Sequence, residues 1–260
     1  MLAENKKILI TGGCGYIAKS LTKQLNKFYD ITTISRNNFD LTSFESMNKF
    51  FQNKHFDVVI HCAVTGGSRL KSDSYKDMDV NLIMYYNLLQ HKNHYDKLIH
   101  FGSGAEIYSP ESPYGLSKRV INRSIQNVDN FYNLRIFGVF DENELDTRFI
   151  KANIKRYINK EPLMIFEDKM MDFIYMPDLI SIVEHYINNE ELPKEIDCMY
   201  PGEQLYLYDI AKIINKLDEY NVTILSEKNA REYIGFHNPI NLDYIGLENG
   251  IKKTYNILKS

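Results

Sequence analysis

The fold is decided by the stretch Ile8-Leu9-Ile10-Thr11-Gly12-Gly13-Cys14-Gly15-Tyr16-Ile17-Ala18. Its apolar start predicts a buried strand, and Leu21 and Leu25 follow with the spacing of a helix. In this strand–turn–helix context, small residues let backbone amides approach a dinucleotide pyrophosphate at the helix N-terminus. We expect Gly12 to make the tight turn, Gly15 to allow close approach, and Ala18 to let the helix pack on the strand.

Further along, the chain carries a second motif, Tyr114-Gly115-Leu116-Ser117-Lys118. Tyr114 and Lys118 are four positions apart, which places them on one face of a helix. An ammonium beside a phenol lowers the pKa of the phenol, so that the tyrosine can transfer a proton while hydride moves. Each motif alone is a weak signal, whereas the two in this order form a strong one.

Strand-like and helix-like patterns alternate through the first half of the chain. Strands are expected near 6–10, 31–35, 57–62, 97–102 and 131–137, and helices near 15–27, 43–53, 76–91 and 114–127. Such alternation predicts βαβ units and a parallel sheet that is covered on both faces. The pattern is less regular after Phe140, where helices are expected near 147–159, 177–189, 207–217 and 246–258.

Length and composition narrow the class of protein. A chain of 260 residues with 44% hydrophobic and 25% charged residues is ordinary for a globular protein with a substantial core. The net charge of −3 gives no case for binding nucleic acid or an anionic membrane, and no apolar run predicts a membrane span. Cys14, Cys62 and Cys198 lack metal-ligand spacing, so we expect small buried residues in a cytoplasmic enzyme without a metal site.

With these motifs the chain resembles the extended short-chain dehydrogenase/reductases, in particular the NAD-dependent epimerase/dehydratase family that modifies nucleotide sugars. The resemblance extends to Asp57–Ala63, Met171–Leu179 and Gly250–Thr254. It implies a doubly wound parallel sheet (Rossmann fold) with a small interleaved C-terminal lobe. Residues 1–140 would form the NADP-binding domain, completed by about 167–200, and residues 141–166 and 201–260 the substrate-binding lobe.

Two segments are similar to those of ketosugar reductases of the GDP-fucose synthase type, and the chain as a whole also resembles reductases of the dTDP-4-dehydrorhamnose type. The two segments are Ala63–Arg69, with its Gly-Gly pair, and the short connection Ser35–Leu41. The similarity implies an NADPH-dependent reductase of a nucleotide-activated keto sugar, with a 4-keto-6-deoxy sugar favoured. A nucleotide-sugar epimerase and a non-catalytic NAD(P)-sensing protein stay open as alternatives.

The end of the second strand bears on the choice of cofactor. Ser35 brings no carboxylate to the ribose, and Arg36 can pair with a 2′-phosphate, which favours NADPH over NADH. A solvent-exposed arginine is the alternative interpretation of Arg36. Asp40 and Leu41 resemble the pair that holds adenine in this family. The remaining cofactor contacts that the resemblance implies are Gly12, Gly15, Tyr16, Ile17, Cys62, Ala63, Val64, Asn81, Phe101, Tyr114, Lys118, Ile136 and Phe137.

In the family a serine or threonine joins the tyrosine and lysine in catalysis. Alignment on Ile107-Tyr108 puts Gly104 at that position, with Ser103 one residue earlier. A shift of one residue in a strand changes the face, so Ser103 can serve if its flanking glycines bend the backbone. We favour Ser103 as the substitute hydroxyl; the alternative is that Tyr114 works with substrate contacts alone.

Dehydration is not expected, because Ala105 replaces the aspartic acid that the family's dehydratases use before Glu106. Glu106 itself has three open roles: contact with a sugar hydroxyl, proton abstraction beside a ketone, or capping of the loop. The proposed substrate contacts are Thr65, Arg69, Gly104, Glu106 and Arg148, with surface salt bridging as the alternative for Arg69.

The family commonly forms homodimers through two helices that here correspond to 76–91 and 114–127. Apolar residues on them are candidates for such an interface, namely Leu82, Leu88, Leu89, Val120 and Ile121. Packing of the same residues against the sheet is the alternative.

Overall fold

The computed structural model describes residues 5–67 and 71–260. The described chain divides into two units. The first runs to Arg135 and includes Val183–Ile196, and the second comprises Ile136–Ile182 and Asp197–Ser260. Each unit is described by itself below.

The first unit is built on a six-stranded sheet, whose spatial order is β2-β1-β3-β4-β5-β9. The strands are β1 (Lys7–Thr11), β2 (Asp30–Ile34), β3 (Phe56–His61), β4 (Tyr95–Ser103), β5 (Phe131–Ile136) and β9 (Glu195–Cys198). β1 pairs in parallel with both β2 and β3, and β3 pairs in parallel with β4. The strand order therefore reverses at β1, and such a switch point opens a crevice at the carboxyl ends of its strands. The predicted doubly wound α/β fold is confirmed.

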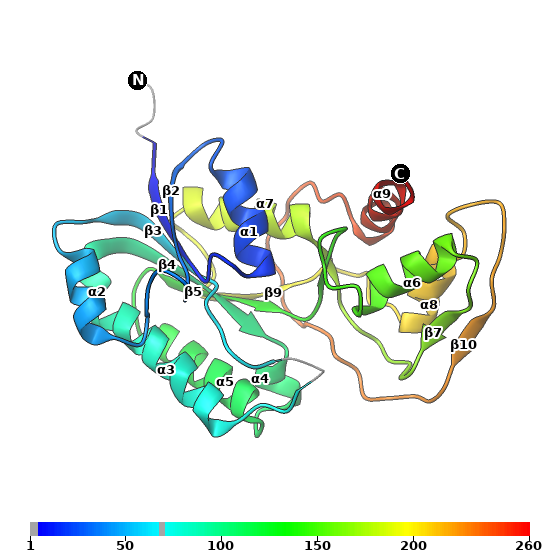
Figure 1. The fold of residues 1–260 in the computed structure, drawn as a ribbon, viewed down its shortest axis with the longest axis horizontal. Helices are drawn as coiled ribbons and strands as arrows, with labels where there is room; N and C mark the ends of the chain where they lie inside the picture. Colours follow the sequence, from blue (N-terminus) through cyan, green and yellow to red (C-terminus); the bar gives the residue numbers. More distant parts are fainter. Residues whose placement is uncertain (1–4, 68–70) are drawn as a thin grey trace. The chain divides into compact units, whose positions relative to one another are not determined.

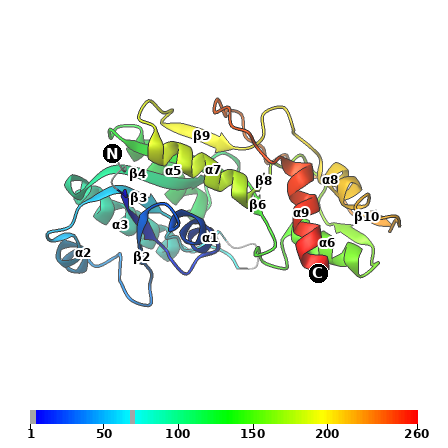
Figure 2. The ribbon, with the colours of Figure 1, turned by 90° about the horizontal axis from the view of Figure 1, so that it is seen from above.

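Helices cover both faces of this sheet (Figures 1 and 2). On one side lie α2 (Phe44–Phe51), α3 (Tyr75–Gln90) and α5 (Pro113–Ile125). On the other lie α1 (Tyr16–Leu25) and the C-terminal end of α7 (Met176–Asn188). Between β4 and α5 the chain makes a one-turn helix, α4 (Ala105–Tyr108), and a short 3-10 helix, η1 (Lys92–His94), precedes β4.

Local sequence starts α3 and α5 at defined residues. Ser74 and Asp77 form a reciprocal capping box at the start of α3. α5 is capped by Ser112, whose hydroxyl accepts a hydrogen bond from the Gly115 amide, and Pro113 occupies the first turn. A Cβ on Gly115 would lie 2.1 Å from the Ser109 carbonyl oxygen, so only glycine lets the preceding chain pass this close. These constraints fix where Tyr114 sits in the first turn of α5.

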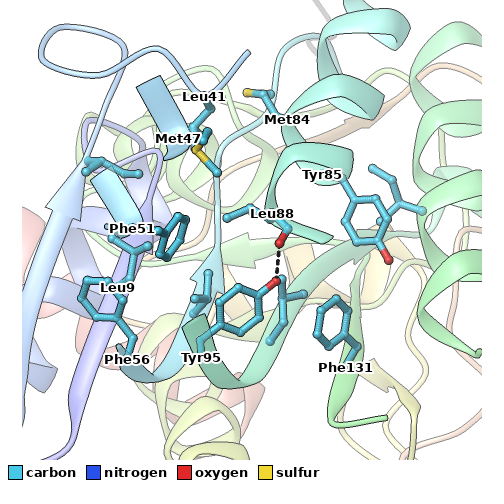
Figure 3. Packing of buried hydrophobic residues seen from close by; sticks show 14 of the residues in the cluster. Leu9, Leu41, Met47, Phe51, Phe56, Met84, Tyr85, Leu88, Tyr95 and Phe131 are labelled. Carbon is cyan, nitrogen blue, oxygen red and sulfur yellow. Dashed lines mark hydrogen bonds between the residues drawn. The ribbon is translucent and has the colours of Figure 1, made fainter. Parts of the chain in front are cut away.

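The core between the sheet and α2, α3 and α5 is apolar and rich in aromatic rings (Figure 3). Phe51 and Leu88 are fully buried, and the buried Tyr95 hydroxyl donates a 2.7 Å hydrogen bond to the Leu88 carbonyl. This packing corrects part of the predicted dimer surface. Leu88 and Ile121 belong to the core, because each points from its helix toward the sheet and is at most 1% exposed. Val120 on α5 is 45% exposed.

The cysteines also differ in part from expectation. All three are free thiols; Cys198 is buried and Cys62 partly buried, but Cys14 is exposed. The prediction of a buried Cys14 was wrong because this residue lies in the turn between β1 and α1 rather than in a packed element. Within residues 5–67 and 71–260, no group of three or more His, Cys, Asp and Glu is arranged to hold a metal ion. No helix in this part of the chain is long and apolar enough to cross a membrane.

The second unit contains two small parallel strand pairs and three further helices. β6 (Val139–Phe140) pairs with β8 (Ile174–Tyr175), and β7 (Leu163–Ile165) pairs with β10 (Ile224–Ser226). The helices are α6 (Phe149–Ile158), α8 (Leu207–Ile214) and α9 (Leu247–Lys259). The buried Asp178 carboxylate joins distant segments, since it accepts hydrogen bonds from the Tyr200 hydroxyl and from the amides of Ile245 and Gly246.

Replacement of Phe51 by alanine should lower the free energy of unfolding by about 3–5 kcal/mol, because it empties a fully buried position. Urea unfolding followed by circular dichroism measures the change. Phe28→Ala is the matched control, since Phe28 is 62% exposed and its loss should cost little. Equal costs for the two variants would contradict the assignment of Phe51 to the core.

Candidate functional site

The loop after β1 is shaped to hold an anionic ligand. Gly12 has φ +70°, and a Cβ there would lie 2.7 Å from the Cα of Ala63, so the loops after β1 and β3 touch through backbone alone. The Gly13 amide donates to the Ile34 carbonyl at 3.0 Å and the Gly15 amide to the Gly12 carbonyl at 2.8 Å. Gly15 is the N-cap of α1 and has no side chain to cap the first turn, which leaves amides there available to a phosphate. These features fit a dinucleotide.

Behind the loop, Ala18 is fully buried, as the sequence predicted for a residue that packs α1 on the sheet. Tyr16 and Ile17 are partly buried in the first turn of α1. The glycine loop and the first turn of α1 therefore follow one another at the carboxyl end of β1, which lies beside β3 in the sheet.

The segment after β2 is a tight turn at the same end of the sheet. The amide and hydroxyl of Ser35 both donate to Asn38 Oδ1, at 2.8 and 3.2 Å, and Arg36 is exposed. Asp40 accepts from the Thr42 hydroxyl and amide, and these hydrogen bonds lower the pKa of its carboxyl, with a smaller effect from the Arg36 charge. Leu41 is buried against the core. One Asp40 oxygen is thus already used to hold the turn.

Asn81 of α3 connects the segment after β3 to α5. Its side-chain oxygen accepts from the Thr65 amide, and its nitrogen donates to the Thr65 carbonyl, both at 2.9 Å. The same nitrogen lies 3.3 Å from the Ser117 hydroxyl of α5. Thr65 in turn donates its hydroxyl to Asp77 at 2.8 Å. Asn81 therefore fixes the path of this segment, on which Cys62 and Ala63 are partly buried and Val64 is exposed.

The second glycine of the Gly66-Gly67 pair lies against the ring of Tyr114, the proposed proton donor. Gly66 and Gly67 have φ of +82° and +71°, and a Cβ on Gly67 would lie 2.8 Å from ring carbons of Tyr114. The sequence analysis did not single out Gly67, although a glycine pair is the signal for such a close approach. Arg69, which was predicted to contact substrate, lies outside the described residues.

Tyr114 and Lys118 lie together at the start of α5. Lys118 Nζ is 5.9 Å from the centroid of the Tyr114 ring and donates to the Phe101 carbonyl at 2.5 Å. Lys118 is 4% exposed, and burial lowers the pKa of its ammonium to about 8 despite the opposing charge of Glu106. Below that pH a positive charge is held beside the phenol.

Ser103 is the last residue of β4 and is buried. The chain turns directly after it, since Gly104 is the N-cap of α4, with φ −53° and ψ −20°. These are right-handed helical angles, so the turn does not itself require glycine. The hydroxyl of Ser103 accepts a hydrogen bond from the Ala105 amide at 3.2 Å.

Glu106 holds the end of β4 in place. Its Oε1 accepts from the Ser103 amide and its Oε2 from the Asn122 side chain, both at 2.9 Å. Arg135 lies 3.3 Å from Oε2 and also pairs with Glu195 at 2.9 Å. Burial raises the pKa of Glu106 and the Arg135 charge opposes that shift. Gly102 provides the space for this carboxylate, because a Cβ there would lie 2.4 Å from Oε1. This geometry matches the loop-capping role among the three roles open for Glu106.

Two buried histidines lie beneath the site. The parallel register of β3 and β4 pairs His61 with His100, and their ring centroids are 5.3 Å apart. His61 Nδ1 is 2.8 Å from the Thr11 hydroxyl, and His100 Nε2 is 3.4 Å from Lys118 Nζ. The sequence analysis did not identify His100. His100 could have been found from its position, because it lies in the strand predicted near 97–102, three residues before Ser103.

Three predicted contacts fall in the second unit. Phe137 is buried with its ring 5.4 Å from that of Tyr233, and Ile136 is partly buried at the end of β5. Arg148 is partly buried at the N-cap of α6.

Comparison with known proteins identifies the family of this chain and several proteins that are similar to it. The model of the NAD dependent epimerase/dehydratase family matches residues 8–198. CDP-abequose synthase of Yersinia pseudotuberculosis is 22% identical over 84% of this chain and 87% of that protein. The dTDP-4-dehydro-6-deoxyglucose reductase of Escherichia coli is 24% identical over 97% of this chain and 92% of that protein. Among solved structures, the NADP-bound GDP-mannoheptose C4 reductase of Campylobacter jejuni has the same fold, with a TM-score of 0.81, 16% identity and coverage of 98% and 99%.

The lowered pKa of Lys118 predicts that the free energy of unfolding depends on pH. Between pH values of about 8 and 10.5, the unfolded chain binds more protons at Lys118 than the folded chain does. The free energy of unfolding therefore gains a contribution that rises with pH. Lys118→Met should remove that contribution and flatten the dependence. Urea unfolding across this interval tests it, with Lys252→Met on the exposed face of α9 as control. Parallel curves for wild type and Lys118→Met would count against a depressed pKa.

Proposed function

The chain belongs to the NAD dependent epimerase/dehydratase family, and from this membership we propose that it is an NADPH-dependent reductase of a nucleotide-activated keto sugar. The observation that carries the proposal is the pairing of Tyr114 with a buried ammonium on the same face of α5. This is the arrangement that proton transfer to a carbonyl oxygen needs.

The dinucleotide fits the edge formed by Gly12, Gly15 and the first turn of α1. When bound, it would supply the hydride that is transferred to the carbonyl carbon. We propose that it is held along that edge and along the loops after β2, β3 and β4, by Tyr16, Ile17, Ser35, Arg36, Asp40, Leu41, Cys62, Ala63, Val64, Asn81 and Phe101. Tyr114 and Lys118, and Ile136 and Phe137 of the second unit, complete the set.

Tyr114 would donate its phenolic proton to the oxygen of the substrate. The phenolate that remains is stabilised by the Lys118 ammonium, which is kept in place by the Phe101 carbonyl. Ser103 is the proposed hydrogen-bond partner of the developing alkoxide, and Glu106 fixes the backbone that carries it. Glu106 is thus proposed to position the loop rather than to act on the substrate directly.

The proposed substrate is a nucleoside diphosphate 4-keto-6-deoxy sugar. The name of the Escherichia coli relative supports this class, since it describes a reductase of a dTDP-linked 4-dehydro-6-deoxy sugar. Thr65, Arg69, Gly104 and Arg148 are the proposed substrate contacts. We also keep the division into an NADP-binding domain and a substrate-binding lobe, and a homodimer through α3 and α5, as proposals. The exposed Ile83, Tyr86 and Val120 are better candidates for that interface than the buried Leu88.

Two alternatives differ in what they require of the site. Epimerisation with Glu106 as base needs a free carboxylate, whereas both oxygens of Glu106 accept hydrogen bonds within the first unit. A cofactor sensor without turnover is favoured by one observation, the glycine at position 104 where the family has a hydroxyl.

Loss of the Tyr114 hydroxyl tests the reductase. Purified protein is given NADPH and a panel of nucleoside diphosphate 4-keto-6-deoxy sugars, and the absorbance of NADPH is followed. Tyr114→Phe should lower kcat by about 10²–10⁴-fold, because the general acid is gone. NADPH affinity, measured by fluorescence titration, should stay within a few fold. Binding of NADPH by wild type without oxidation of any sugar would favour the sensor, and unchanged kcat in the variant would exclude Tyr114 as proton donor.

Arg36 tests the choice of cofactor. Arg36→Ala should weaken NADPH binding by roughly tenfold or more, because a charge-assisted contact to the 2′-phosphate is lost, and leave NADH binding unchanged. Arg123→Ala, an exposed arginine on α5, is the control. Equal losses for the two cofactors, or tighter binding of NADH than of NADPH by wild type, would contradict the proposed preference.

A further inference from the structure

A buried imidazole lies next to the Lys118 ammonium, in addition to the tyrosine. Lys118 Nζ is 3.4 Å from His100 Nε2 and 2.5 Å from the Phe101 carbonyl oxygen. Both acceptors belong to consecutive residues of β4, and both side chains of the lysine–histidine pair are nine-tenths or more buried. The ammonium is therefore held by β4 through two hydrogen-bond acceptors in a region closed to water.

The contact with Lys118 assigns the proton of His100. The neighbouring His61 lies with Nδ1 2.8 Å from the Thr11 hydroxyl, whose oxygen also accepts from the Ala63 amide at 3.1 Å. A protonated Lys118 has only donors, so His100 Nε2 must accept and His100 carries its hydrogen on Nδ1.

With this assignment, the core contains a buried N–H group, at His100 Nδ1, that has no acceptor within the described part of the chain. Among the described residues, His100 Nδ1 has no hydrogen-bond partner, and the side chain is only 1% exposed. A buried N–H without a partner costs stability, and an apolar residue at this position would avoid the cost. The other ring nitrogen, Nε2, explains the histidine at this position, because it accepts a hydrogen bond from Lys118.

The protonation states of the groups around the pair also favour a hydrogen bond from Lys118 to His100. Lys118 faces Glu106 of α4, His61 of β3 and Cys62 directly after it, His100 of β4 and Tyr114 of its own helix. Burial lowers the pKa of His61 to about 3 and holds the pKa of His100 well below its usual value, with the Lys118 charge as a further cause. Both imidazoles are therefore neutral while Lys118 is charged, and His100 presents a lone pair to the ammonium.

We propose that His100 is a positioning residue: its neutral Nε2 accepts a hydrogen bond from the Lys118 ammonium, keeps that group protonated, and holds it under Tyr114. Its role in turnover rests on the reductase activity proposed above, whereas its effect on Lys118 is a property of the protein alone. His100 acts through Lys118 and needs no contact with the substrate.

Two substitutions separate hydrogen bonding from packing. His100→Leu removes the acceptor and also the buried N–H without a partner, so it should fold without a large loss of stability. His100→Gln restores an acceptor oxygen that can face Nζ. Tyr85→Phe is the control, because the Tyr85 ring lies 6.3 Å from that of His100 while its hydroxyl bonds Ser124 and not Lys118.

The readout is the carbon-13 chemical shift of the Lys118 Cε, followed against pH in protein without cofactor or substrate and assigned with Lys118→Arg. Wild type and Tyr85→Phe should titrate alike, with a pKa of about 8. His100→Leu should titrate roughly one pH unit lower, because a hydrogen bond to the charged form is lost. His100→Gln should move back toward wild type.

An unchanged titration in His100→Leu would overturn the proposal, and so would an equal shift in the leucine and glutamine variants, because packing would then be the cause. If the leucine variant does not fold, a lowered value in His100→Gln alone would overturn it. The shift needs no turnover, so it can hold even if no sugar is reduced. If sugar is reduced, the alkaline limb of kcat should move to lower pH in His100→Leu and stay in Tyr85→Phe.

Discussion

The buried ammonium of Lys118 is the constraint around which the first unit is organised. A positive charge that is 4% exposed requires acceptors, and β4 supplies them through the Phe101 carbonyl and His100. The lysine reaches β4 from α5, whose start is fixed by the Ser112 cap. The tyrosine at the start of α5 then lies beside the charge.

Close approach of backbone gives the site its shape. Gly12 lies against Ala63, Gly67 against the Tyr114 ring, and Gly102 against the Glu106 carboxylate, and in each case a Cβ would lie within 2.8 Å of another heavy atom. The first joins the loops after β1 and β3, the second brings the segment after β3 to α5, and the third lets α4 fold back on β4. Because these glycines have no side chains, neighbouring segments can meet at one edge of the sheet.

Sequence predicted the regular elements of the first unit closely. The pattern near 76–91 corresponds to α3, and that near 97–102 to β4, because capping residues and apolar runs are local signals. α4, a single turn, carries too few residues for a periodic pattern, and the short strands of the second unit depend on pairing with segments far along the chain. Local preference for such segments is weak, so tertiary contacts decide them.

By itself, the sequence determined the glycine loop, the start of α5 and the spacing that puts Tyr114 and Lys118 on one helical face. Only the tertiary structure decided that Glu106 turns inward to hold the Ser103 amide and that Leu88 and Ile121 face the sheet. The same is true of His100, which meets His61 through the register of two parallel strands and Lys118 through the packing of α5 on β4. Spacing along a helix is fixed by its own geometry, whereas contacts between strands and helices depend on how the whole core packs.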